Sequence, residues 1–371
     1  MKGFLTGLIF TILLFSGAAR AQEAAAATEK KALTDKAFAL YQQGKLDDAI
    51  ELAAKVVRLE EKSNQTDTSS RVNAIMNLAR MKRDNFALSR NKSRDKNYDV
   101  RSRIGITERA SENARESEEL YRKAIALSES GGRGRTAQTA DAKSELAWLT
   151  SNFLPPTDKP SIAYSRSRID EAERLFTESL AINEESRGKD ATETLALVLG
   201  LGNFYLKYDN YEKALPFYER YIPAVEAKSG KNHPGLVDAL RPYARILAAT
   251  TQDSDSAAAV KRIEEITGQK ENSPSGELSL HLRSKDSVAF HANFFNDLRS
   301  RNPVFRPQVT NTHVKVTVDE NGKIIEAVAD AKDAGVRQRA EREILKWTVR
   351  PFSYNGTTRK TRGYLSYSEA R

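Results

Sequence analysis

A repeat with a period of 42 residues constrains the fold of this chain more than any other feature of its sequence. Repeats of this length are typical of stacked helical units, none of which can bury its apolar face alone. We therefore expect a solenoid rather than a single globular core. Four pairs of residues share the offset, namely Ile169 and Tyr211, Ala172 and Ala214, Phe176 and Tyr218, and Gly188 and Gly230.

The spacing of apolar and small residues within each repeat is helical. Tyr211, Ala214, Tyr218 and Tyr221 follow one another at three, four and three residues, which places them on one side of a helix. Gly202, in the preceding helix, is small enough for the two helices to approach closely. The pattern recurs along the chain and predicts a mostly α-helical solenoid of about five hairpins over residues 30–268.

Two copies of the repeat carry extra residues between their helices. These insertions lie near residues 84–109 and 152–164. The first is basic and polar, and the second contains a Pro-rich segment. Insertions of this kind belong at the loop edge of a solenoid.

The repeats resemble tetratricopeptide repeats of the 42-residue variety found in kinesin light chains. The resemblance covers residues 30–268 and implies a groove that binds peptides. Its motifs are Ala214-Leu-Pro-Phe-Tyr218-Glu-Arg and Gly230-Lys-Asn-His233-Pro234-Gly-Leu-Val237-Asp-Ala-Leu240.

First-helix positions that are three to four residues apart, anchored on the small residues Ala147, Gly202 and Ala244, are expected to face this groove. They are Trp148, Asn203, Arg241 and Arg245. Arg241 and Arg245 are one helical turn apart and share a face. An asparagine followed in the next repeat by two cations resembles half of the carboxylate clamp of peptide-binding tetratricopeptide proteins. An ordinary solvated face is the alternative interpretation.

The pattern of the sequence changes after Gly268. Residues 269–286 have the composition of a linker. Val314–Val318 alternates with period two, Asn321-Gly322 marks a hairpin, and a helix follows that ends near Trp347. A second Asn-Gly turn and a final strand complete a small α+β domain with the order β-β-α-β over residues 287–371. We expect Trp347 to be the main aromatic anchor of its core.

This segment resembles the C-terminal domain of TonB. The residues that carry the resemblance are Asp319-Glu-Asn-Gly322-Lys323, the helix ending in Trp347, and Pro351 followed by Asn355-Gly356. In that family the domain binds an extended peptide by strand addition. The resemblance therefore implies a peptide-binding sheet edge, which we assign to the last strand at Tyr364, Leu365, Ser366 and Tyr367.

Residues 1–21 predict an export signal. Lys2 precedes the apolar run Phe4–Phe15, and Ala19-Arg20-Ala21 fits the rule for signal cleavage. The apolar run is too short to span a bilayer comfortably, because about 20 residues are needed. We expect cleavage after Ala21 and a periplasmic or secreted protein without an integral membrane span. An uncleaved anchor is the alternative.

The sequence carries no motif for catalysis or nucleotide binding. It contains no cysteine and four histidines. His281 and His291 are ten residues apart with no third ligand in view, which argues against a metal site. We therefore expect a protein that is not an enzyme, with no catalytic residue, no bound metal and no cofactor.

Basic residues are concentrated between Arg80 and Arg103. Charge alone would permit nucleic-acid binding, but Phe86 and Tyr98 are too few aromatic residues for a stacking platform. Export also argues against a nucleic-acid partner. We expect a solvated insertion, with contact to anionic wall polymer or lipid headgroups as the functional alternative.

Together these features predict an exported adaptor that binds peptides or partner proteins, with an outer-membrane protein among the candidates. A TonB-type energy-transducing component of outer-membrane transport is the alternative. That alternative requires an uncleaved anchor and a Pro-rich span, and residues 1–21 favour cleavage instead.

Overall fold

The computed structural model describes residues 25–62, 68–93, 97, 99–153, 162–272, 278–279 and 309–370. The chain divides into two units, Met1–Thr194 and Leu195–Arg371. The expected signal peptide, most of the 152–164 insertion and most of the 269–286 linker lie outside the described residues. These three assignments stay predictions.

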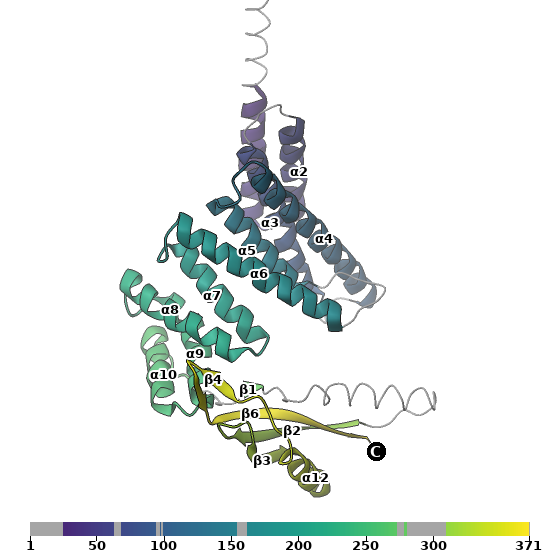
Figure 1. Cartoon of the computed structure of the whole chain (residues 1–371). Helices are drawn as coiled ribbons and strands as arrows, with labels where there is room; N and C mark the ends of the chain where they lie inside the picture. The colour runs from purple at the N-terminus through teal and green to yellow at the C-terminus, as the bar shows by residue number, and fades with distance from the viewer. Residues whose placement is uncertain are drawn as a thin grey trace, which may run out of the picture. The chain divides into compact units, whose positions relative to one another are not determined.

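The described part of the first unit is a stack of helices in antiparallel pairs (Figure 1). Each second helix packs on the first helix of its own pair and on the pair that follows. The mostly α-helical prediction is confirmed here. The elements are a helix over residues 25–42, α2 (Leu46–Lys62), α3 (Ser69–Lys92), α4 (Val100–Ser130), α5 (Ala137–Asn152) and α6 (Ile162–Ser186).

Small residues bring the two helices of a pair together, as the repeat predicts. Ala79 of α3 and Ser117 of α4 are both fully buried, and the Ser117 hydroxyl donates a hydrogen bond to the Ala79 carbonyl at 2.7 Å. Ser179 of α6 repeats this bond to Ala140 of α5, also at 2.7 Å. A serine at this position thus allows the two helices to pack closely, and its buried hydroxyl still has a hydrogen-bond partner.

The segment near 84–109 is not the loop expected of an insertion. α3 continues to Lys92 and α4 begins at Val100, so the extra residues lengthen both helices of this pair. The side chain of Asp99 caps α4 by accepting a hydrogen bond from the Ser102 amide at 3.0 Å. The sequence prediction failed here because a long solvated helix carries no more apolar residues than a polar loop does.

Helices α4 and α6 are joined by a buried ion pair. Arg168 of α6 donates from both terminal nitrogens to the two carboxylate oxygens of Glu118 on α4, each at 2.9 Å. A third bond at 3.1 Å goes to the carbonyl of Phe153. The Arg168 and Glu118 side chains are 7% and 13% exposed. This buried ion pair therefore connects two neighbouring hairpins.

The second unit begins within the first turn of α7 and continues with further helices. Its Gly202 approaches α8 so closely that an added Cβ would lie 3.0 Å from the Tyr218 ring. This contact explains the glycine that the repeat places there. The elements are α7 (Thr192–Lys207), α8 (Tyr211–Ser229), the 3-10 turn η1 (Pro234–Leu236), α9 (Val237–Ala249) and α10 (Asp253–Thr267).

The same unit contains the C-terminal strands, which for the described residues form a four-stranded sheet in the order β1-β6-β2-β3. β6 pairs antiparallel with β2 over ten residues and parallel with the two residues of β1. A two-stranded hairpin, β4 (Phe352–Tyr354) with β5 (Thr357–Arg359), turns at Asn355-Gly356 as predicted. The sheet strands are β1 (Leu278–Ser279), β2 (Val309–Val318), β3 (Ile324–Asp330) and β6 (Thr361–Ala370).

Helix α12 (Ala334–Ile344) covers one face of this sheet. Its buried stripe is the predicted Val336, Ala340 and Ile344. Trp347 was expected to end the helix as the main core anchor, and this expectation is wrong. The helix ends three residues earlier, Trp347 is only partly buried, and Val349 is fully buried.

The segment after α12 leaves the helix because it pairs with the β2–β3 turn. Thr348 bridges Lys323, and the Val349 amide donates to the Gly322 carbonyl at 2.8 Å. Gly322 has φ 87°, and a Cβ added to it would lie 2.1 Å from the Val349 carbonyl oxygen. The turn at Asn321-Gly322, which the sequence predicts, is therefore also the site of a close backbone contact with Val349.

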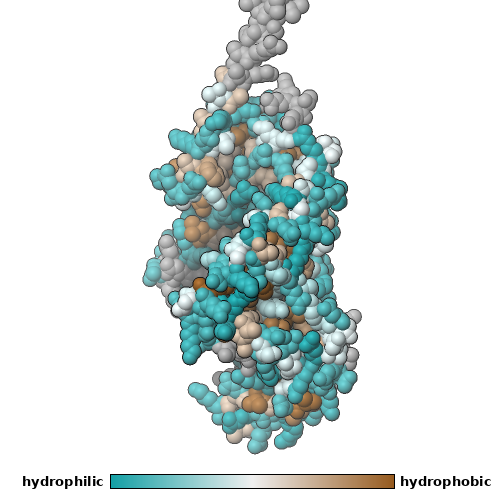
Figure 2. Space-filling view, turned by 90° about the vertical axis from the view of Figure 1, so that its left-hand side faces the viewer, coloured by the Kyte–Doolittle hydropathy of each residue, from teal (hydrophilic) through white to brown (hydrophobic). Residues whose placement is uncertain are grey.

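No helix in the described part of the chain has the length and hydropathy needed to cross a bilayer. The face seen in Figure 2 is mostly hydrophilic, and its apolar residues form small separate groups. Scattered apolar residues are normal on protein surfaces.

Candidate functional site

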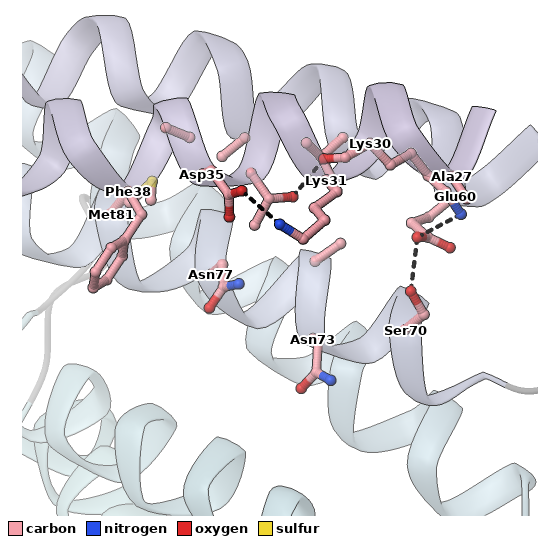
Figure 3. Close-up of a pocket in the computed structure, with 15 residues that line it drawn as sticks. Ala27, Lys30, Lys31, Asp35, Phe38, Glu60, Ser70, Asn73, Asn77 and Met81 are labelled. Carbon is pink, nitrogen blue, oxygen red and sulfur yellow. Dashed lines mark hydrogen bonds and ion pairs between the residues drawn. The ribbon is translucent and has the colours of Figure 1, made fainter. Parts of the chain in front are cut away.

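A cavity of about 520 Å³ lies in the first unit, between the helix over residues 25–42, α2 and α3 (Figure 3). Its floor is apolar and is built from buried side chains of all three helices. Phe38 stands at its edge and is 53% exposed. The floor residues are Ala37, Ala53, Val56, Ala74 and Met81.

Polar side chains form the rim of the cavity. Asn73 and Asn77 are one turn apart on α3, so they share a face. Across from them, Lys31 forms an exposed ion pair with Asp35 at 3.1 Å. Such surface pairs contribute at most about 1 kcal/mol, so a ligand can displace this one at little cost.

One end of the cavity is held by a buried charge pair. Lys30 contacts Glu60 at 2.8 Å, with side chains only 14% and 6% exposed. Glu60 also accepts a hydrogen bond from the Ser70 hydroxyl at 2.7 Å. These contacts join three helices around the cavity and fix its shape.

A second polar cluster lies further along α3, where this helix meets α5. Glu145 of α5 forms ion pairs with Arg80 and Arg83 of α3. Asp84 accepts hydrogen bonds from Arg83, at 2.8 Å, and from the Tyr41 hydroxyl. Burial and the bond to Asp84 raise the pKa of Tyr41.

Trp148, which the repeat places in the groove, belongs to this cluster. Its ring is 37% exposed, and the Arg83 guanidinium lies over it at 5.5 Å from the centroid. A cation above an exposed indole is a favourable contact. The structure thus links Trp148 to first-helix residues of the preceding repeat.

The other three predicted groove residues lie in the second unit. Asn203 is exposed and accepts a hydrogen bond from the Tyr218 hydroxyl at 3.0 Å. Arg241 and Arg245 are one turn apart on α9, as predicted. Arg241 donates two bonds of 3.1 Å to Glu271, so its charge is already compensated within the chain. The assignment of these residues to a peptide groove stays a prediction.

The predicted C-terminal sheet edge lies on β6, which has β2 on one side along its length. On the other side Gly363 and Tyr364 pair with β1. Leu365 points into the core and is buried, whereas Ser366 is exposed and Tyr367 is half-buried. Of the four predicted residues, Tyr364 therefore already has strand partners on both sides. Peptide binding at this edge stays a prediction.

Two fully buried tyrosines differ in how their hydroxyls are satisfied. The Tyr218 hydroxyl donates to Asn203, whereas that of Tyr121 on α4 has no hydrogen-bond partner. Burial raises the pKa of Tyr121 to about 12. An unsatisfied buried hydroxyl costs about 1–3 kcal/mol.

Tyr121→Phe is therefore expected to raise the free energy of unfolding of the first unit by about 1 kcal/mol, because it removes the unsatisfied group. Tyr218→Phe should lower the stability of the second unit by a similar amount, since it breaks a bond to Asn203. Urea denaturation measures both. Equal destabilisation by the two changes would show that the Tyr121 hydroxyl has a partner in solution.

Within the described residues, histidine, aspartate and glutamate side chains do not gather in groups of three that could hold a metal ion. The cavity rim carries amide, ammonium and carboxylate groups at its surface, with apolar side chains beneath. This arrangement can bind both the main chain and an apolar side chain of a ligand.

No sequence pattern predicts the cavity as a whole, although one signal indicates residues near it. The predicted groove residues Trp148, Asn203 and Arg245 each follow the small residue of a first helix. The same offset from Ala79 gives Arg80, which the structure places in the cluster with Glu145. Asn73 lies seven residues before Arg80, on the same side of α3.

Residues 161–227 match the family model described as tetratricopeptide repeat. The match covers α6, α7 and most of α8, where the 42-residue motifs are clearest. The tetratricopeptide prediction is confirmed for these residues, and repeats of this kind generally bind protein partners. The resemblance of the C-terminal domain to TonB stays a prediction. No curated protein matches the chain.

Two solved structures are similar to this chain at low sequence identity. One is a Podosopora anserina protein with nearly identical TPR-like repeats, proposed to be a kinesin light chain. It is 18% identical, with 66% of this chain and 97% of that chain covered and a TM-score of 0.46. Another is BtubC (BKLC) from P. vanneervenii, 15% identical, with 68% and 86% covered and a TM-score of 0.48.

Proposed function

We propose that this protein is a non-enzymatic adaptor that binds an extended peptide of a partner protein in the cavity of its first unit. The observation that carries the proposal is the combination of an apolar floor with two asparagines on the rim of a cavity of about 520 Å³. Tetratricopeptide repeats in the same chain support a protein ligand.

The floor favours an apolar side chain of the ligand. Burying one there removes its surface from water, which contributes about 1.5–3 kcal/mol for a large aliphatic or aromatic residue. The exposed ring of Phe38 adds contact area at the entrance. We therefore expect the bound peptide to carry at least one large apolar residue.

The asparagines favour a main chain in extended conformation. A carboxamide both donates and accepts hydrogen bonds, and an extended peptide presents unpaired amide and carbonyl groups along its length. Asn73 already accepts a bond from Gln138 of α5, which orients its carboxamide. Asn77 lies one turn further along the same face.

Display of a random peptide library, followed by fluorescence polarisation with a labelled synthetic copy of an enriched peptide, tests this proposal. Enriched peptides should share a large apolar residue. Asn73→Ala combined with Asn77→Ala should weaken binding about tenfold, since a typical hydrogen bond contributes about 0.5–1.5 kcal/mol. Asn91→Ala, an exposed asparagine of α3 outside the cavity, is the matched control.

Two results would contradict the proposal. One is a library that yields no enriched peptide. The other is an enriched peptide whose affinity is the same for the cavity variant and for the Asn91→Ala control. A peptide that binds elsewhere on the chain would give that second result.

A further inference from the structure

We propose that the far end of the α3–α4 hairpin is a second docking surface, and that it binds anionic lipid bilayers. We define this projecting tip as residues 87–93 and 99–109. The surface is separate from the peptide cavity and does not depend on the proposed function.

The tip extends beyond the described ends of the neighbouring helices α2 and α5. On one side, Asn85 donates a hydrogen bond of 2.7 Å to Asp47, which lies in the first turn of α2. On the other side, Arg90 donates to the carbonyl of Asn152, the last residue of α5. The described ends of α2 and α5 thus lie level with residues 85–90 of α3. The helices of the tip continue past them.

The side chains at the start of α4 are largely exposed to solvent. The buried residues of this helix begin only at Ala110, so its first ten residues contain none. Val100 is 63% exposed and Ile104 is 54% exposed, and the two lie one turn apart on one face. Leu88 on α3 is also exposed. Among the described residues, three of the eight exposed large apolar side chains thus lie on this tip.

The charge of the tip is positive. Its acids are Asp99 and Glu108, and Asp99 caps α4 by accepting hydrogen bonds from the Ser102 amide and hydroxyl. No acid in the described part of the chain pairs with Lys92 or Arg101. The basic residues are Arg90, Lys92, Arg101, Arg103 and Arg109, which leaves a net charge of 5 − 2 = +3.

Exposed apolar side chains on the same helix segments as several arginines and a lysine fit the interface of an anionic bilayer. The apolar side chains enter the headgroup region, while the long cationic side chains remain among the phosphates. A nucleic acid would instead favour aromatic side chains for stacking. The described residues of the tip contain none.

Sedimentation of the full-length protein with vesicles tests the proposal. Vesicles of phosphatidylcholine with about one third phosphatidylglycerol should bind the protein, and pure phosphatidylcholine vesicles should not. Each cation near such a surface contributes about 1 kcal/mol. Lys92→Gln with Arg101→Gln should therefore reduce the partition coefficient by about tenfold or more. Val100→Ser with Ile104→Ser should reduce it by about tenfold through the apolar contact.

Matched controls carry the same changes at exposed positions elsewhere. Lys261→Gln with Lys346→Gln removes one cation from α10 and one from the segment after α12, and Val328→Ser removes an apolar side chain from β3. These should leave binding unchanged. The proposal is overturned if anionic vesicles do not bind or if the tip variants match the controls. The proposal is also overturned if only the charge variants weaken vesicle binding and the protein binds duplex DNA or polyglutamate as tightly as it binds anionic vesicles.

Discussion

Gly322→Ala is expected to unfold the C-terminal sheet while the first unit stays folded. The new Cβ would lie 2.1 Å from the carbonyl oxygen of Val349, which is backbone and cannot move aside alone. A positive φ adds strain of about 1 kcal/mol or more for alanine. Separating the two segments would break the bond between Val349 and Gly322. We expect a loss of about 3 kcal/mol or more, a large share of the stability of a small domain.

The two tryptophans of the chain make this measurement specific. Trp148 lies in the first unit and Trp347 packs against the C-terminal core. In a Trp148→Phe background, fluorescence during urea denaturation reports the sheet alone. Gly356→Ala is the control, because this glycine also has positive φ but has open space where a Cβ would be. Equal effects of the two changes would show that the close contact at Gly322 has no energetic role.

Arg168→Met is expected to destabilise the first unit by about 3 kcal/mol. Removing one partner of a buried ion pair costs about 3–5 kcal/mol, because the other charge stays buried. Here the lower value applies, since Arg122 still contacts Glu118 at 2.8 Å. Fluorescence of Trp148 in a Trp347→Phe background measures the change. Arg122→Met, which removes a half-exposed arginine from the same carboxylate, should cost much less.

The same pair predicts a dependence on pH. Burial raises the pKa of Glu118, but the hydrogen bonds and charges of Arg168 and Arg122 outweigh burial, so the pKa is lowered overall. A carboxyl group whose pKa is lowered in the folded state stabilises the fold at pH values above its pKa in the unfolded state, which is about 4.3. That contribution is lost as the pH falls through the lower pKa of the folded state. The stability of Arg168→Met should therefore fall less on acidification than that of the unchanged protein. An identical acid profile would contradict this assignment.

Much of the helical architecture could be predicted from residue spacing. Small residues at a fixed offset identified helix pairs, and the structure shows why: at Ala79 and Ser117 the helices touch through a hydrogen bond. The same reasoning failed for residues 84–109, because helix formation there depends on propensity and capping by Asp99 rather than on an apolar stripe. In the C-terminal domain the strands and turns were predicted, while the early end of α12 depends on a pairing with Gly322 that spacing does not encode.

The candidate site was less predictable than the fold. Groove residues were inferred from their spacing around the small residue of each first helix, and this found Trp148 but not its partner Arg83. The cavity depends on three helices whose contributing residues are separate in sequence, such as Lys30, Glu60 and Ser70. Each of these residues alone is typical of a solvated helix surface. Only the packing of the first hairpin against α3 brings them together.

The position of β6 inside the sheet has a consequence for biosynthesis. Among the described strands β6 is made last, yet it is the one that β2 and β1 both pair with. While the chain is being made, β2, β3 and α12 can assemble, but the free edge of β2 stays unpaired and is open to association with other chains. The helices of the first unit depend on local contacts and can fold during translation. We therefore expect the sheet to close only after residues 361–370 have left the ribosome, well after the helical repeats have folded.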